Sequence, residues 1–243
     1  MALPTAPDTL VVSEVVPATV VGDGPTAGWR CALIRLGGCN LACTWCDVPY
    51  SWDGTMVDLN VALRQRLVKT VLDDALSASP GLVLITGGEP LLQQRAGGWS
   101  ALLQALRQQG VETEVHTNGT LAPGAETVDL VNRFVVSPKL SHSGEPTWTR
   151  ILPDVLQSWA ALVEQGKVAF SFVVRDRMDV QTVTTLTTLH GIPHGLVWIS
   201  PEATTTTRLV EVTAEVAETA LDHGFNLATR VGLLAARRRA AVA

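Results

Sequence analysis

Short apolar runs alternate with longer segments of helical apolar spacing along most of this chain. Runs rich in β-branched and other apolar residues predict strands over 31–36, 82–86, 111–117, 133–137, 168–174, 196–200 and 226–231. Apolar residues three and four positions apart predict helices over 59–78, 99–109, 151–164, 180–190 and 209–223. Alternation of strands and helices is typical of βαβ units, so we expect an α/β fold with a parallel sheet.

About six strands follow the cysteine-rich segment that begins at Cys39, too few for a closed eight-stranded barrel. They predict a partial (β/α) barrel or an open doubly wound sheet. In both architectures the functional groups lie at the carboxyl ends of the strands.

Polar or glycine-rich segments follow five of the predicted strands, where that rule places a site. Because the carboxyl ends of parallel strands meet at one edge, we expect these segments to face one rim. They are the cysteine-rich segment after 31–36, "TGGEP" (86–90), "HTNGT" (116–120), "SPK" (137–139) and "SPE" (200–202).

The composition favours one globular domain that acts on a small molecule. The chain has 243 residues, of which 47% are hydrophobic and 17% charged, so we expect a single domain over 1–243 with a substantial core. A short N-terminal extension is expected over 1–12 and a C-terminal tail over about 233–243. The net charge of −5 argues against nucleic-acid binding through a basic face.

The N-terminal segment predicts neither a secretory signal nor a membrane span. No basic segment precedes an apolar run, and the run over 10–22 is interrupted by Glu14 and Pro17. We therefore expect a cytoplasmic protein whose thiols stay reduced. Clustered cysteines in that compartment more often bind metal or act in catalysis than form disulfides.

Three of the four cysteines, Cys39, Cys43 and Cys46, form a C-x3-C-x2-C pattern. A structural zinc site would need a fourth ligand, and Cys31 lies inside a predicted strand. A redox pair of Cys43 and Cys46 would leave Cys39 without a role. An iron–sulfur cluster held by three thiolates would keep one iron open for another ligand.

This spacing resembles the signature of the radical S-adenosylmethionine (SAM) superfamily, in which the open iron of a [4Fe–4S] cluster binds SAM. A narrower resemblance, to the 7-carboxy-7-deazaguanine synthase family, covers nearly the whole chain. The segments that carry it are "SEVV…VVGDGPTAG" (13–28), "IRLGGCNLACTWCD" (34–47), "ITGGEPLLQ" (85–93), "TNGT" (117–120), "VVSPKL" (135–140) and "FVVRD" (172–176).

The resemblance implies a role for each matching residue. Cys39, Cys43 and Cys46 would hold the cluster. The implied SAM contacts are Trp45, Cys46, Asp47, Gly87, Gly88, Glu89, Ser137, Pro138 and Lys139. The implied substrate contacts are Val20, Val21, Gly22, Arg35, Thr86 and His116. A guanidinium grips a carboxylate through two hydrogen bonds, so Arg35 is the expected anion partner; the alternative for it is an ordinary surface ion pair.

The resemblance also implies a reaction and its partners. The family converts 6-carboxy-5,6,7,8-tetrahydropterin into 7-carboxy-7-deazaguanine with loss of ammonia, on the way to 7-deazapurines such as preQ0 and queuosine. The implied cofactors are a [4Fe–4S] cluster, SAM and Mg²⁺, and the implied reductant is a flavodoxin or ferredoxin. The implied fold is a radical SAM partial barrel, and the implied assembly is a homodimer.

Several positions depart from the family pattern near the expected substrate end. Val21 stands in place of a glutamine, Asp23 and His116 each in place of a glutamate, and Ser171 in place of a lysine. Val48 stands at the position of a magnesium-binding hydroxyl and has no side-chain oxygen. The alternative is therefore a related radical SAM enzyme acting on a different small heterocyclic substrate. A non-enzymatic iron–sulfur protein would need neither "GGEP" nor "SPK".

Overall fold

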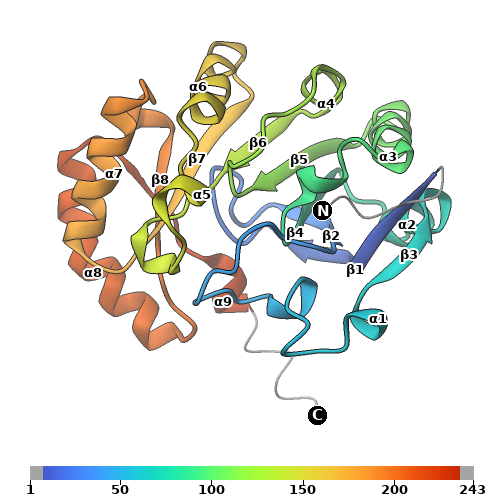
Figure 1. Cartoon of the computed structure of the whole chain (residues 1–243), viewed down its shortest axis with the longest axis horizontal. Coiled ribbons are helices and arrows are strands. Elements are labelled where there is room, and N and C mark those ends of the chain that lie inside the picture. The colour runs from blue at the N-terminus through green and yellow to red at the C-terminus, as the bar shows by residue number, and fades with distance from the viewer. Residues whose placement is uncertain (1–7, 236–243) are drawn as a thin grey trace.

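The computed structural model describes residues 8–235, which form one β-sheet with helices packed along its outer face (Figure 1). The strands are β1 (Thr9–Val20), β2 (Arg30–Leu36), β3 (Arg64–Leu67), β4 (Leu82–Gly87), β5 (Glu112–Thr117), β6 (Arg133–Val136), β7 (Val168–Val174), β8 (Val197–Pro201) and β9 (Asn226–Leu227). The helices are α1 (Leu59–Ala62), α2 (Val68–Leu76), α3 (Gly97–Gln108), α4 (Ala125–Leu130), α5 (Thr147–Arg150), α6 (Pro153–Ala161), α7 (Arg177–Leu189), α8 (Thr206–Asp222) and α9 (Val231–Ala235).

The sheet has nine strands in the order β3-β1-β2-β4-β5-β6-β7-β8-β9. From β2 to β9 every neighbouring pair is parallel, whereas β1 pairs antiparallel with both β2 and β3. The two ends of the sheet do not pair with each other, so the barrel stays open. The predicted α/β fold with a mostly parallel sheet is confirmed.

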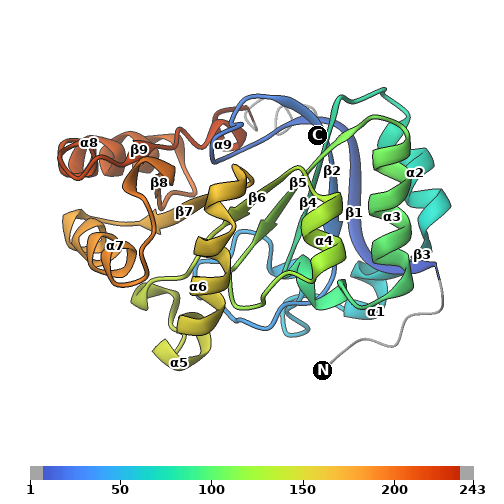
Figure 2. The ribbon, with the colours of Figure 1, turned by 90° about the horizontal axis from the view of Figure 1, so that it is seen from above.

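The core lies between the sheet and the outer helices, and Figure 2 shows α3, α4 and α6 side by side along the sheet. Apolar side chains from strands and helices form one large buried cluster. Its largest fully buried members include Trp99, Trp159, Phe134, Phe170 and Phe172. This packing makes the sheet a rigid frame for the loops at its carboxyl edge. No helix within residues 8–235 is both long and apolar enough to cross a membrane.

The six predicted strands from 31–36 to 196–200 are confirmed, and two segments differ. The predicted helix over 59–78 is wrong, because α1 and α2 are separated there by β3. This short edge strand pairs with Thr9–Val12 of β1, a long-range contact that local apolar spacing does not encode. The predicted strand over 226–231 ends at Leu227, and α9 follows it.

The apolar run over 10–22, for which no strand was predicted, forms most of β1. The strand accommodates Pro17 at a register shift between Val16 and Thr19, the kind of irregularity at which a strand tolerates proline. The expected extension over 1–12 is wrong for residues 9–12, which belong to β1. Of the expected tail, residues 233–235 belong to α9, and residues 236–243 lie outside the described part of the chain.

Candidate active site

A cavity of about 530 Å³ opens at the carboxyl edge of the parallel strands. It is lined by the segment after β2, by the ends of β4 to β8 and by residues of the α8 and α9 region. Most of the residues expected to bind the cluster, SAM or substrate lie in this lining: Arg35, Cys39, Cys43, Trp45, Cys46, Asp47, Val48, Thr86, Gly87, Gly88, His116, Ser137 and Lys139. The segments that follow the parallel strands therefore line one cavity, as expected from their position at the carboxyl edge.

Glycines bring the end of β4 directly against the cysteine segment. A Cβ on Gly88 would collide with the carbonyl oxygen of Gly38 and would lie 2.7 Å from Cys39 Cβ. The Glu89 amide donates to the same Gly38 carbonyl at 2.8 Å. Gly38 itself has a φ of +92°, which a side chain would disfavour. The two motifs thus pack backbone to backbone at the floor of the cavity.

The "TNGT" segment joins these two motifs through a chain of hydrogen bonds. Glu89 is fully buried and accepts hydrogen bonds from Thr117 Oγ1 at 2.8 Å and from the Asn118 amide at 2.7 Å. Asn118 Nδ2 in turn donates to Asn40 Oδ1 at 2.9 Å, inside the cysteine segment. Burial raises the pKa of the Glu89 carboxyl, and these donors oppose that shift. Glu89 therefore joins the motifs from behind the cavity wall.

Cys39, Cys43 and Cys46 all line the cavity. Within residues 8–235, no three His, Cys, Asp or Glu side chains lie close enough together to hold one metal ion. A [4Fe–4S] cluster takes one thiolate per iron, so its ligands stand farther apart. Burial raises the pKa of Cys39 to about 12 and raises that of Cys43, so a bound cluster must displace their protons. Trp52 Nε1 donates to Cys46 Sγ at 3.2 Å.

The segment after β6 forms the wall opposite "TGGEP". Lys139 Nζ donates to Ser137 Oγ at 2.9 Å and lies 5.4 Å from the centre of the Trp45 ring. The amide of Thr44 donates to the Ser143 carbonyl at 2.9 Å, so the cysteine segment and residues 137–145 are held together. Arg150 Nη1 donates to the Lys139 carbonyl at 2.9 Å and supports the segment from outside.

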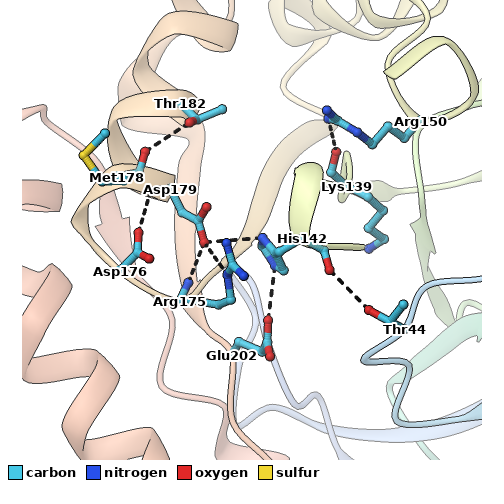
Figure 3. Close-up of polar contacts among 10 residues, drawn as sticks. All are labelled: Thr44, Lys139, His142, Arg150, Arg175, Asp176, Met178, Asp179, Thr182 and Glu202. Carbon is cyan, nitrogen blue, oxygen red and sulfur yellow. Dashed lines mark hydrogen bonds and ion pairs between the residues drawn. The ribbon is translucent and has the colours of Figure 1, made fainter. Parts of the chain in front are cut away.

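His142 connects this wall to α7 and to the end of β8, as Figure 3 shows. Its side chain is 1% exposed, with Nδ1 3.3 Å from Asp179 Oδ2 and Nε2 3.2 Å from Glu202 Oε2. Neither contact has hydrogen-bond alignment. The His142 ring lies 5.6 Å from the Trp45 ring, centre to centre. The contacts of His142 therefore hold the segment 137–145, on which Lys139 lies against Trp45, to α7 and to the end of β8.

We expect an Asp179→Asn variant to lose about 1–3 kcal/mol of unfolding free energy at neutral pH. Burial opposes ionisation of Asp179, but contacts with His142 and Arg175 hold its pKa well below the usual range. A lowered folded-state pKa stabilises the protein above the unfolded value of about 4, and the contribution is lost as the pH falls through the folded value. Urea unfolding at pH 7 and pH 3.5 should therefore show a smaller difference from wild type at pH 3.5.

The control for this measurement is Asp129→Asn, which removes an exposed ion pair with Arg107 on the surface. An exposed pair contributes about 0–1 kcal/mol, so this variant should unfold almost as wild type does. An Asp179→Asn variant as stable as wild type at pH 7 would contradict the role given to the His142 contacts.

The other end of the cavity holds basic side chains that contact carboxylates. Arg35 Nε lies 2.6 Å from Glu14 Oε1, which also accepts from Tyr50 Oη at 2.9 Å. His116 Nε2 lies 2.7 Å from Oε1 of Glu114, whose side chain is fully buried. Burial alone would raise the pKa of Glu114, but hydrogen bonds from His116 and other donors bring it below its usual value. His116 and Arg35 are thus held in defined positions at the cavity surface.

Two of the positions that depart from the family pattern contact each other. Asp23 Oδ2 accepts a hydrogen bond from Ser200 Oγ at 2.6 Å and a longer one from Ser171 Oγ at 3.4 Å. Asp23 and Ser171 both line the cavity. Two positions expected to depart from the family pattern therefore lie side by side in the cavity.

Five of the expected site residues are not part of the cavity lining: Val20, Val21, Gly22, Glu89 and Pro138. The side chain of Val21 is fully buried in a small cluster with Cys31. The lining also contains polar residues that the sequence did not single out as site residues: Asp23, Asn118, Glu202, Arg208 and Arg230. "TNGT" and "SPE" pointed to Asn118 and Glu202, whereas no local motif marks Arg208 or Arg230.

Comparison with known proteins agrees with this geometry. A family model described as "Radical SAM superfamily" matches residues 33–137. The chain is 31% identical to 7-carboxy-7-deazaguanine synthase from Pyrobaculum aerophilum over 219 residues, which cover 90% of this chain and 91% of that protein. The chain belongs to the 7-carboxy-7-deazaguanine synthase family of the radical SAM superfamily. The predicted family is thereby confirmed.

Other members of the 7-carboxy-7-deazaguanine synthase family show similar coverage. The protein of that name from Hyperthermus butylicus is 31% identical over 222 residues, covering 89% of each chain. The crystal structure of QueE from Escherichia coli superposes with a TM-score of 0.66 at 20% identity, over 90% of this chain and 93% of the other. This likeness confirms the radical SAM fold.

Membership of the radical SAM superfamily implies a [4Fe–4S] cluster and SAM. The residues of this 7-carboxy-7-deazaguanine synthase family member fit both groups. Three thiols lie on one segment at the cavity, and glycines without side chains line the wall beside them. A magnesium ion fits less well, because Val48 offers no oxygen at the cavity surface.

Proposed function

We propose that this chain converts 6-carboxy-5,6,7,8-tetrahydropterin into 7-carboxy-7-deazaguanine and ammonia. One observation carries the proposal: a single cavity joins the three cysteines to Arg35, Thr86 and His116. When bound, a reduced [4Fe–4S] cluster with SAM on its open iron supplies a 5′-deoxyadenosyl radical that removes a hydrogen atom from the substrate. The membership of the family over nine-tenths of the chain supports the same reaction.

In this proposal, Cys39, Cys43 and Cys46 hold the cluster, and the residues around them hold SAM. Gly87 and Gly88 allow an amino acid group to approach the backbone closely. Lys139 offers a cation at the wall, and the Trp45 ring beneath it excludes water from the cavity. The remaining SAM contacts that we propose are Cys46, Asp47, Ser137, and the backbone of Glu89 and Pro138.

At the other end, Arg35 and His116 face the substrate. Arg35 is 14% exposed and pairs with Glu14, so its guanidinium is oriented before an anion arrives. His116 is 21% exposed and rests on the fully buried Glu114, which fixes the direction of its ring. We propose that Thr86 and the backbone of residues 20–22 complete this end.

We also propose a cytoplasmic location, where a flavodoxin or ferredoxin would reduce the cluster, and a homodimeric assembly. No nucleic acid or membrane takes part in the proposed reaction. The reduced thiols on which the cluster depends are typical of the cytoplasm.

Incubation of the anaerobically reconstituted enzyme with SAM, dithionite and 6-carboxytetrahydropterin should yield 7-carboxy-7-deazaguanine and ammonia in equal amounts. Mass spectrometry of the product and an ammonia assay measure this outcome. A parallel incubation without SAM should yield neither product. Formation of 5′-deoxyadenosine without deazaguanine would instead favour the alternative, a radical SAM enzyme for a different heterocyclic substrate.

A further inference from the structure

Arg230 reaches the cavity from the far end of the chain. Its Nη2 lies 3.1 Å from Asp47 Oδ2, and its Nη1 donates to the Ala203 carbonyl at 3.2 Å. The side chain is only 21% exposed and lines the cavity together with Val48. The residue has a φ of +45°, a left-handed conformation that few residues other than glycine adopt. Such backbone conformations are concentrated at functional sites.

Arg230 contacts Asp47, one of the proposed SAM contacts, and its segment packs against Gly22 of the proposed substrate end. Gly232 lies against Gly22, where a Cβ added to Gly22 would meet Gly232 Cα at 3.7 Å. Asp47 precedes Val48, the position at which the family resemblance places a magnesium-binding hydroxyl. Arg230 therefore brings a positive charge beside the residue that precedes Val48, the position where the resemblance implies a metal ligand that a valine side chain cannot supply.

The other cations of the lining have different partners or more exposure. Arg35 pairs with Glu14 at 2.6 Å, and Lys139 donates to Ser137 beside Trp45. Arg208 is 47% exposed and lies 3.7 Å from Glu211 on its own helix. Arg230 is less exposed than Arg208, and its hydrogen bonds to Ala203 and Asp47 use two of the five N–H donors of a guanidinium. The remaining donors can bind another anion.

We propose that Arg230 binds the carboxylate of the substrate and supplies the positive charge that a magnesium ion would otherwise provide. This assignment rests on the proposed function, because it takes a carboxylated pterin as the ligand. A guanidinium is always charged and binds a carboxylate through two parallel hydrogen bonds. Asp47 and Ala203 hold the Arg230 guanidinium in place, so the carboxylate would bind it directly without a divalent cation between them.

The test measures binding of 6-carboxypterin, the oxidised and unreactive analogue, to the SAM-loaded holoenzyme by quenching of pterin fluorescence. Wild type should bind it equally well with Mg²⁺ and with EDTA. Arg230→Gln should weaken this binding about 10- to 100-fold, the range for loss of a hydrogen-bonded charge. Binding of 6-methylpterin, which has no carboxylate, should change less than about twofold, because the loss concerns one charged contact.

Two further variants complete the experiment. Arg107→Gln removes an arginine from an exposed surface pair with Asp129 and should leave both affinities unchanged. Arg230→Lys keeps a positive charge but not the two parallel donors, so its affinity for 6-carboxypterin should lie between those of wild type and Arg230→Gln. Since the lysine variant is the milder change, it keeps the test decisive if the glutamine variant does not fold. In the Arg230→Gln background, Val48→Thr should make binding of 6-carboxypterin stronger with Mg²⁺.

Four results would overturn the assignment. If Arg230→Gln lost affinity equally for both pterins, Arg230 would have a structural role. If it lost affinity for neither, Arg230 would have no role in binding. Stronger binding of 6-carboxypterin to wild type with Mg²⁺ would show that a metal is still required. Failure of wild type to bind either pterin would overturn the proposed function itself, and the assignment with it.

Discussion

A Cys43→Ala variant is expected to hold no [4Fe–4S] cluster after anaerobic reconstitution and to form no product. Loss of an outer partner of a metal ligand typically costs about 10- to 100-fold in metal affinity or activity, and loss of a ligand itself should cost more. Iron and sulfide analysis, together with visible absorption, measures cluster content. A zinc-containing wild-type protein without iron would contradict the cluster assignment.

The chain provides its own control in Cys31→Ala. Cys31 is fully buried in a small apolar cluster with Val21, Leu82 and Leu84, and it does not line the cavity. Its replacement should cost about 1–2 kcal/mol of stability, a typical value for one buried substitution, and should leave cluster content unchanged. Loss of iron from Cys31→Ala to the same extent as from Cys43→Ala would contradict the proposed ligand set.

A Gly88→Ala variant is expected to lose both stability and cluster binding. The added Cβ would collide with the Gly38 carbonyl oxygen and lie 2.7 Å from Cys39 Cβ, so the start of the cysteine segment must move. Overpacking of this kind costs about 1–3 kcal/mol. Thermal unfolding should show the loss of stability, and iron content after reconstitution should show displacement of Cys39.

Gly81→Ala is the matched control, since a Cβ there would meet no atom within 4 Å. Its unfolding free energy should stay within about 0.5 kcal/mol of wild type, as for most surface substitutions. A Gly88→Ala variant with normal stability and a full cluster would mean that the cysteine segment does not depend on this close packing.

Local apolar spacing predicted most of the fold because most strands and helices bury apolar residues that recur at regular intervals along the sequence. The strand β7 (Val168–Val174) and the helix α8 (Thr206–Asp222) follow such patterns. The edge strand β3 (Arg64–Leu67) has three exposed residues out of four, so its sequence has no apolar face to recognise. It exists because β1 offers unpaired backbone groups at that edge.

The candidate site divides in the same way. The residues proposed to hold the cluster and SAM stand in contiguous segments: three cysteines within eight positions, a glycine pair after β4 and "SPK" after β6. Motifs of this kind can be recognised in the sequence because a loop places consecutive residues around one ligand. Arg230 was missed because it is 183 positions from Asp47, its partner across the cavity.

The order of residues alone therefore indicates the fold class, the family and the kind of cofactor, since each depends on spacing within a short segment. The tertiary structure alone decides which charges share the cavity, because their partners come from distant segments. It places Glu89 behind the wall, where burial and hydrogen bonds occupy its carboxylate. It also sets Arg230 beside Asp47, the residue that precedes Val48. Folding brings these charges within a few ångströms of one another, and only at such distances do they interact strongly.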